Sequence, residues 1–182
     1  MIILIGLPGS GKSTVGRQLA RKLSASYLDS DHLIEQRLGC SIREYFEREG
    51  EAAFRDVEEA VIAETVLAFG ADRLTILATG GGAVIRENNR KLLRSAGRVV
   101  YLRSSPEDLY KRLRHDRNRP LLQGVDPLQR LRDLYEQRDP LYRETASFQI
   151  ETGRPSVATL VNMIAMQLDL AADIPSNSTS AG

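Results

Sequence analysis

A stretch near the start of the chain reads Gly6-Leu7-Pro8-Gly9-Ser10-Gly11-Lys12-Ser13-Thr14, directly after the apolar run 2–5. It matches the full pattern G-x-x-x-x-G-K-[ST], which is typical of phosphate-binding loops between a strand and a helix. Gly9 and Gly11 permit backbone conformations closed to residues with a Cβ, so successive amide N–H groups can converge on phosphate oxygens. The sequence therefore predicts a phosphate loop followed by the N-terminus of a helix.

The side chains of this loop extend the prediction to a nucleotide and a metal ion. Lys12 brings a positive charge to the β- and γ-phosphates, and the hydroxyl of Ser13 is placed to bind Mg²⁺. We expect nucleotide contacts from Gly9, Ser10, Gly11, Lys12, Ser13 and Thr14. The loop alone does not say whether the protein is a switch, a motor or a transferase.

Composition excludes several other classes of protein. The 182 residues fit one domain, and 25 Lys and Arg against 24 Asp and Glu leave no basic field for nucleic acid. One cysteine, Cys40, excludes an internal disulfide, and two histidines are too few for a zinc site of Cys/His type. The run 2–5 is too short for a signal peptide or a membrane span. We expect a cytoplasmic protein without membrane or nucleic-acid partners.

Short β-branched runs alternate with longer amphipathic stretches, as in βα units on a parallel sheet. The sequence predicts a three-layer α/β/α sandwich around a five-stranded parallel sheet. The expected strands are Ile2–Ile5, Tyr27–Asp29, Leu74–Ala78, Val99–Leu102 and Phe148–Ile150. Together with the phosphate loop, this architecture is that of P-loop nucleoside-triphosphate hydrolases.

Helix signals complete the predicted organisation. Ser41 and Glu44 have capping-box spacing, and Pro106 and Pro127 suit the first position of a helix. A long helix is expected over Glu51–Phe69, ended by Gly70. We expect a single domain over 1–170, with substrate-binding helices at about 31–62, a flexible lid at about 112–125 and a disordered tail over 171–182.

Two carboxylates, Asp29 and Asp31, follow the second predicted strand. Residues two apart on a strand share a face, so one can hold a magnesium-bound water while the other takes a proton from an acceptor hydroxyl. The third predicted strand ends without an acidic residue, which favours Asp29 as the metal-side carboxylate. The alternative is structural, with Asp31 capping a helix through Leu38.

Further polar features are candidates for an acceptor site. Arg55 and Glu58 lie three apart on one helix face, although an ordinary surface ion pair is the alternative. Gly80, Gly81 and Gly82 follow the third strand and leave no side chain where a small ligand would press on the backbone; a flexible connection is the alternative. Arg138, before the helix-breaking Pro140, is a candidate second cation for an anion.

The segment 111–119 holds five basic residues, which a closing loop can bring to a transferring phosphoryl group. Arg119 is the best candidate for that role, whereas His115 is expected at the surface. A solvated basic loop or a nucleic-acid patch is the alternative. The segment Arg154-Pro155, after the last strand, suits packing against a nucleotide base.

In this order, GLPGSGKST, LDSD, GEAAFRDVE, TGGG, RNRPLL and RDPLY resemble the shikimate kinase family over about 1–170. That family, within the nucleoside-monophosphate-kinase-like branch, transfers the γ-phosphate of ATP to the 3-hydroxyl of shikimate on the way to chorismate and aromatic amino acids. The resemblance implies ATP and shikimate as substrates and Mg²⁺ as cofactor.

The resemblance also assigns roles to individual residues, and Asp31 becomes the base that binds the shikimate hydroxyls. It implies that Lys12 and Arg119 act in catalysis, Ser13 binds Mg²⁺ directly and Asp29 binds it through water. The remaining implied roles are a carboxylate clamp of Arg55 and Arg138, support of Arg55 by Glu58, closure of Gly80, Gly81 and Gly82 on the substrate, and adenine contacts of Arg112, Arg154 and Pro155.

Rival hypotheses stay open at this point. A gluconate kinase or another small-molecule kinase has the same architecture, and a non-catalytic ATP-binding module needs no acceptor pocket. The combination of Arg55, the triple glycine and Arg138 favours the shikimate reading. A monomer is expected because no apolar stripe exceeds what the core needs.

Overall fold

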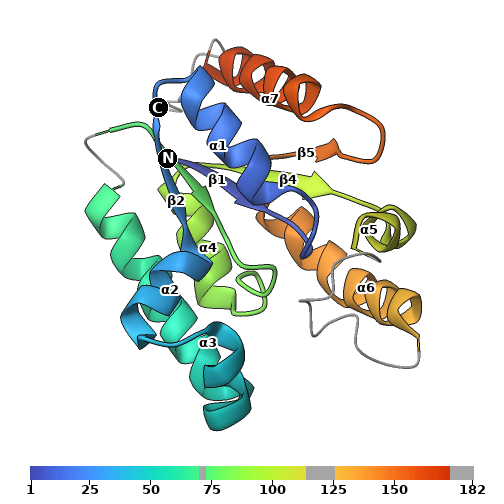
Figure 1. Ribbon diagram of the computed structural model, residues 1–182. Coiled ribbons are helices and arrows are strands. Elements are labelled where there is room, and N and C mark those ends of the chain that lie inside the picture. The colour runs from blue at the N-terminus through green and yellow to red at the C-terminus, as the bar shows by residue number, and fades with distance from the viewer. Residues whose placement is uncertain (70–72, 114–125, 173–182) are drawn as a thin grey trace, which may run out of the picture.

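The computed structural model describes residues 1–69, 73–113 and 126–172. Five parallel strands form one sheet in the order β2-β3-β1-β4-β5 (Figure 1). Their bounds are β1 Ile2–Ile5, β2 Ser26–Asp29, β3 Thr75–Ala78, β4 Arg98–Arg103 and β5 Phe148–Glu151. All five predicted strands are confirmed within two residues at each end.

Strand β1 is the centre of the sheet, and every residue in it is buried. Leu4 pairs with Ala78 on β3 and with Val100 on β4. After β1 the chain forms β2 and β3 on one side and then crosses to form β4 and β5 on the other, so the carboxyl end of β1 lies at the switch point of the topology. Ligands of open parallel sheets bind at that edge.

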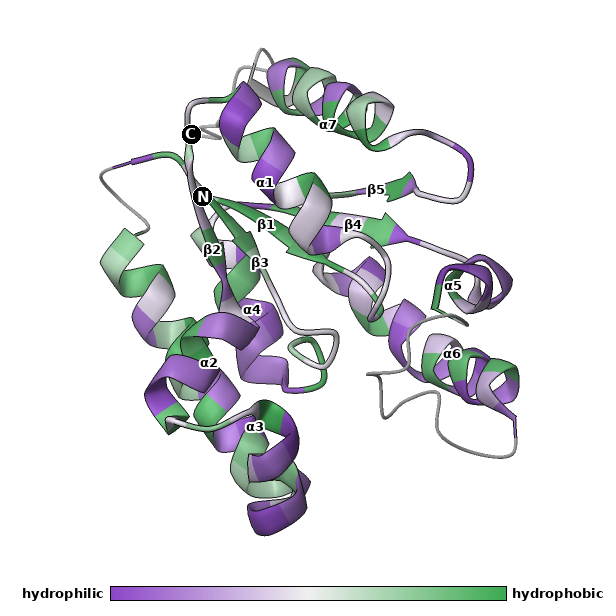
Figure 2. Cartoon of the chain, in the orientation of Figure 1, coloured by the Kyte–Doolittle hydropathy of each residue, from purple (hydrophilic) through white to green (hydrophobic). Residues whose placement is uncertain are grey.

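Helices cover both faces of the sheet, which confirms the three-layer prediction. Helices α1 (Lys12–Lys22) and α7 (Val157–Ala172) pack on one face, and α4 (Glu87–Ala96), α5 (Pro106–Leu113) and α6 (Pro127–Thr145) pack on the other (Figure 1). Figure 2 shows hydrophobic residues along the central strands and purple, hydrophilic residues on the outer helix faces. Burial of these apolar faces on both sides of the sheet holds the layers together.

Helices α2 (Ser30–Leu38) and α3 (Ile42–Phe69) form a separate arm beside the edge strand β2 (Figure 1). A small core of Ile34, Phe54 and Val61 joins them. Gly50 kinks α3 with a φ of 81°, so a straight helix begins near the predicted start at Glu51. The arm places one face of α3 opposite the end of β3.

The predicted helix starts are confirmed by their caps. Ser41 Oγ accepts from Glu44 N–H at 3.2 Å, and the Glu44 carboxylate accepts from Ser41 N–H at 2.9 Å. Pro106 and Pro127 are the first residues of α5 and α6, and α6 continues through Pro140, so the expected helix break at that proline is wrong. Helix α7 continues to Ala172, so residues 171 and 172, which were expected in the tail, are helical.

Several expectations fall outside the described residues. These are the tail over 173–182, Gly70, and the part of the expected lid over 114–125, which includes His115 and Arg119. In the rest of the chain, no helix is long and apolar enough to cross a membrane.

Candidate active site

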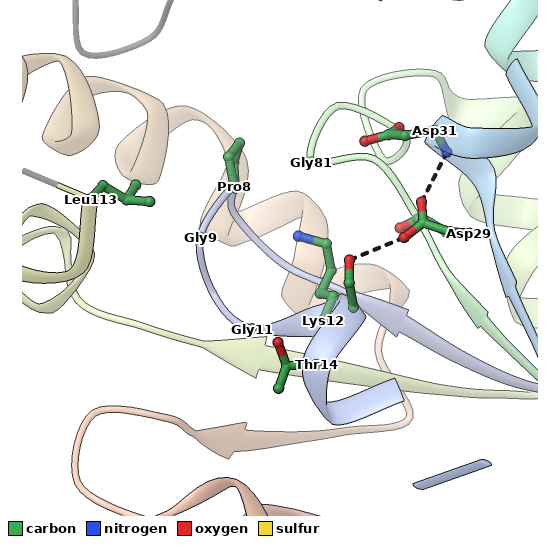
Figure 3. A pocket seen from close by; sticks show the side chains of 11 residues that line it. Pro8, Gly9, Gly11, Lys12, Thr14, Asp29, Asp31, Gly81 and Leu113 are labelled. Carbon is green, nitrogen blue, oxygen red and sulfur yellow. Dashed lines mark hydrogen bonds between the residues drawn. The ribbon is translucent and has the colours of Figure 1, made fainter. Parts of the chain in front are cut away.

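A cavity of about 320 Å³ opens at the carboxyl edge of the sheet, beside the end of β1. Figure 3 shows Lys12 at its centre, Asp29 and Asp31 to one side, and Leu113 of α5 to the other. The lining residues are Pro8, Gly9, Gly11, Lys12, Ser13, Thr14, Asp29, Asp31, Thr79, Gly81 and Leu113. The structure therefore brings the phosphate loop and both predicted carboxylates into one cavity.

The phosphate loop has the backbone that its glycines predict. Gly9 and Gly11 have φ values of 84° and 96°, in the left-handed region, and Gly11 is the N-cap of α1. Lys12 Nζ donates to the carbonyls of Gly6 at 2.8 Å and Leu7 at 2.9 Å. This ammonium group and the N-terminus of α1 make the base of the cavity attractive to anions.

Asp29 is the last residue of β2 and directly precedes α2. Its carboxylate accepts hydrogen bonds from Ser13 Oγ at 3.0 Å, Tyr27 OH at 3.0 Å and Asp31 N–H at 3.1 Å. Asp29, not Asp31, is thus the N-cap of α2, so the alternative that placed Asp31 at the cap is wrong. The shared-strand-face argument also needs correction, because Asp31 lies in the first turn of the helix.

Asp31 points into the cavity from that first turn (Figure 3). Crowding by protein atoms desolvates its carboxyl group, although the side chain still reaches solvent through the cavity. Desolvation, followed by the neighbouring charge of Asp29, raises the Asp31 pKa to about 6, while Lys12 opposes the shift. A carboxylate with a raised pKa in a phosphate-binding cavity is a candidate base.

The triple glycine is tightly packed against the protein itself. A Cβ on Gly80 would lie 2.5 Å from Asp31 Oδ1, one on Gly81 would lie 2.6 Å from Pro8 Cδ, and one on Gly82 would lie 2.2 Å from Arg55 Nη1. No left-handed φ is recorded at these three residues, so close approach is what requires glycine. Side chains of the site take up the three Cβ positions, while Gly81 also lines the phosphate-loop cavity.

Arg55 and Glu58 form a buried ion pair on α3. Arg55 Nη1 donates to Glu58 Oε2 at 2.6 Å, and Glu58 is only 1% exposed. Glu51 Oε1 accepts from Arg55 Nη2 at 3.1 Å. Burial raises the Glu58 pKa, and the guanidinium of Arg55 opposes that shift. The surface-pair alternative is therefore wrong, since the pair is held inside the protein with a fixed geometry.

A second cavity, of about 530 Å³, lies between α3 and α6. Arg55 and Arg138 both line it, together with Phe46, Glu51, Ile85, Arg130, Leu134, Gln137 and Leu141. Two guanidinium groups on facing helices suit a carboxylate, which accepts paired N–H donors. Phe46, Ile85, Leu134 and Leu141 give the cavity apolar walls, which suit a ligand with a carbon ring.

The carbonyl of Gly81 links the two cavities. It accepts from Arg138 Nη1 at 3.2 Å and from Tyr142 OH at 2.5 Å, while Gly81 itself lines the phosphate-loop cavity. Tyr142 is fully buried and its ring stacks on Tyr101 at 4.9 Å between centroids. The glycine run is thus fixed between the base candidate on one side and the arginine pair on the other.

The predicted adenine residues lie away from the first cavity. Arg112 donates to the carbonyl of Thr152, which joins α5 to the segment after β5. Arg154 in that segment is exposed and Pro155 is half-buried. The structure brings Arg112 close to this segment, and a role of the three residues in adenine binding stays a prediction.

The donor atoms at Ser13 and Asp29 fit a magnesium site. A hydroxyl and a carboxylate oxygen 3.0 Å apart are the hard oxygen ligands that Mg²⁺ prefers. Within the described ranges there is no group of three or more His, Cys, Asp or Glu residues arranged as a metal cage. A site with only two protein ligands agrees with a Mg²⁺ ion whose other ligands are phosphate oxygens and water.

Three of the site residues that sequence reasoning missed are Thr79, Tyr142 and Tyr27. Thr79 lines the first cavity and its Oγ1 donates to Leu4 O at 3.2 Å; it directly precedes the glycine run, which was the available signal. Tyr142 follows Pro140 within the quoted stretch RDPLY, where only Arg138 was singled out. Tyr27 gave no local signal, because its hydroxyl contact with Asp29 depends on how β2 ends.

Comparisons with known proteins agree with this geometry. The shikimate kinase family model matches residues 8–169. A shikimate kinase of Paracidovorax citrulli (strain AAC00-1) is 61% identical over 171 residues, which cover 93% of this chain and 92% of that protein. A shikimate kinase of Burkholderia pseudomallei (strain K96243) is 57% identical over 170 residues, covering 93% and 90%.

Solved structures extend the comparison to the fold. The structure of shikimate kinase from Acinetobacter baumannii in complex with shikimate has a TM-score of 0.86 and 45% identity, covering 95% of this chain and 94% of that one. A gluconokinase from Sinorhizobium meliloti has a TM-score of 0.54 at 16% identity, covering 94% and 96%. This second likeness is one of fold alone.

Proposed function

The chain belongs to the shikimate kinase family, and from that membership we propose that it transfers the γ-phosphate of ATP to the 3-hydroxyl of shikimate. The products are 3-phosphoshikimate and ADP. The single observation that carries the proposal is the buried Arg55 beside Arg138, one glycine segment away from a phosphate loop. That arrangement suits a small carboxylated acceptor next to a nucleotide.

We assign the acceptor carboxylate to the two arginines. Glu58 fixes Arg55 at one nitrogen, and Arg138 is fixed at the carbonyl of Gly81. Because both guanidinium groups are held before the substrate arrives, little conformational entropy is lost on binding. The clamp sets the direction in which the acceptor ring extends from the second cavity toward Asp31.

We assign the role of base to Asp31. With a pKa of about 6, its carboxyl group is ionised at neutral pH and accepts the proton that the 3-hydroxyl loses as the oxygen attacks phosphorus. Gly80 allows the backbone to lie against Asp31 and leaves the carboxylate facing the cavity. Correct placement of the hydroxyl is the main requirement, since phosphoryl transfer proceeds through a loose transition state.

On the nucleotide side, the phosphate loop and Lys12 bind the phosphates. Ser13 and Asp29 are the residues that would hold Mg²⁺, which neutralises phosphate charge when bound. We carry over from the family a role for Arg119 at the transferring phosphoryl group and adenine contacts of Arg112, Arg154 and Pro155. A single catalytic domain, a cytoplasmic location and a monomeric state complete the proposal.

The test is ADP release from ATP and Mg²⁺ by the purified chain, with shikimate, gluconate, AMP or no acceptor. We expect release that depends on shikimate alone, and phosphorus NMR of the product identifies the esterified hydroxyl. Gluconate is included as an alternative acceptor because the fold is similar to that of a gluconokinase. Release stimulated by gluconate or AMP instead would contradict the assigned acceptor, and ATP binding without transfer would support a non-catalytic module.

A further inference from the structure

The carboxylate of Asp29 lies between two cavities. One is the phosphate-loop cavity, and the other, of about 320 Å³, is lined by Arg17, Tyr27, Leu28, His32 and Leu33 together with Asp29. A carboxylate with open space on both sides can rotate away from the nucleotide. Its direction therefore depends on the groups that donate hydrogen bonds to it.

Three donors fix this carboxylate, and they divide its two oxygens. Asp31 N–H binds Oδ1, whereas Ser13 Oγ and Tyr27 OH both bind Oδ2. A serine hydroxyl can offer a lone pair to a cation while its hydrogen stays on a carboxylate, so the Ser13 contact is compatible with Mg²⁺. Tyr27 is the side-chain donor to Asp29 that the proposed mechanism does not use.

The ring of Tyr27 is itself held in place, so its hydroxyl has a defined position. A Cβ on Gly16 would lie 2.7 Å from Tyr27 Cε2, which means that the ring lies directly against the backbone of α1. The guanidinium of Arg17 covers the ring at 5.4 Å from its centroid. These two contacts with α1 fix the ring, and its hydroxyl donates to Asp29 Oδ2 at 3.0 Å.

We propose that Tyr27 is a positioning residue, whose hydroxyl holds Asp29 in the orientation that binds the magnesium ion of the nucleotide complex. The inference rests on the proposed function, which assigns Mg²⁺ to Ser13 and Asp29. Groups that orient metal-binding carboxylates contribute about 10–100-fold to metal affinity. Because two other donors remain on Asp29, we expect the lower end of that range for Tyr27.

The test uses Tyr27→Phe, which removes the hydroxyl and keeps the ring against Gly16 and Arg17. The dissociation constant of ADP is measured by calorimetry in Mg²⁺ and in EDTA. We expect affinity in EDTA to match the wild type, while the gain in affinity from Mg²⁺ falls about tenfold. Activity at limiting Mg²⁺ falls in parallel and recovers at saturating Mg²⁺.

Tyr45→Phe is the matched control, since Tyr45 also has an arginine over its ring, Arg48 at 5.6 Å, but lies on the helical arm. It should behave as the wild type. If the ADP affinity of the wild type were the same with and without Mg²⁺, the assignment of Mg²⁺ to Ser13 and Asp29 would itself be contradicted. A normal Mg²⁺ effect in both the wild type and Tyr27→Phe, or an equal loss with and without Mg²⁺, would overturn the role of Tyr27 alone.

Discussion

The guanidinium of Arg55 occupies the space where a side chain on Gly82 would begin, because a Cβ there would lie 2.2 Å from Arg55 Nη1 and 2.4 Å from Nη2. The same guanidinium is bound to Glu58 at 2.6 Å. Backbone and side chain thus fit each other at the wall of the acceptor cavity. The guanidinium of Arg55 cannot move away from Gly82 without breaking its buried ion pair with Glu58, which would destabilise the fold.

Gly82→Ala tests this relationship. The new methyl group displaces the guanidinium from its position, so we expect the KM for shikimate to rise about 10–100-fold, as for the loss of a hydrogen bond to a charged group. The ADP dissociation constant should stay the same, because the phosphate loop is untouched. Steady-state kinetics and calorimetry measure the two quantities.

Gly80→Ala is the matched control, since it adds the same methyl group two residues away. There the Cβ would meet Asp31 Oδ1 at 2.5 Å, so kcat should fall more than the shikimate affinity does. Identical kinetic effects of the two alanines would contradict the separate assignment of clamp and base.

Arg138→Lys tests the second cation of the clamp. Lysine keeps the charge and loses the planar fork, so the acceptor carboxylate loses paired hydrogen bonds and Gly81 O loses one donor. We expect the KM for shikimate to rise about tenfold, equivalent to about 1.4 kcal/mol, with a smaller change in kcat. An unchanged affinity in a folded variant would remove Arg138 from the clamp.

Asp31→Asn tests the base. The amide cannot accept the proton from the hydroxyl, so kcat should fall by about 10²–10⁴, the usual contribution of a general base. Binding of ADP should persist, because Lys12 and the loop amides do not depend on the carboxylate. Turnover close to that of the wild type would show that placement alone drives the transfer.

The sequence was sufficient for the sheet and the phosphate loop, because both depend on local patterns. Short apolar runs specify buried strands, and Gly9 and Gly11 specify a backbone that other residues rarely adopt. The sequence also predicted that the carboxylates of Asp29 and Asp31 belong to one site. It did not predict their geometry, because Asp29 ends β2 and caps α2, and sequence alone does not tell a strand end from a helix start.

Contacts between distant segments explain the rest. The hydroxyl of Tyr142 meets Gly81 O across 61 positions of sequence, and no local pattern encodes that distance. The kink at Gly50 agrees with the predicted helix start at Glu51, but the sequence did not show that the segment before it, from Ile42, stays helical up to the kink. The sequence indicated that the glycine run matters because it has no side chains. It did not show that Asp31, Pro8 and Arg55 are the groups packed against it.

Stability gives a second test of Asp31, in the protein without nucleotide or metal. Its pKa is raised from 3.8 to about 6, so the folded state binds the proton more tightly than the unfolded state does. Stability from this group is fully present below pH 3.8 and declines as the pH rises through about 6. At neutral pH the ionised carboxylate therefore destabilises the fold, as expected for a desolvated carboxylate beside a like charge.

Asp31→Asn should remove that part of the pH dependence. After allowance for the solvent that still reaches the carboxylate, we expect a gain of about 1 kcal/mol at pH 7, or about 2–4 °C in Tm. The gain should vanish at pH 4, where the wild-type carboxyl is protonated in the folded state. Thermal unfolding at the two pH values measures it, with Asp133→Asn on the exposed face of α6 as control. A variant less stable than the wild type at pH 7 would contradict the raised pKa. It would mean that contacts of the ionised carboxylate stabilise the fold by more than its desolvation destabilises it.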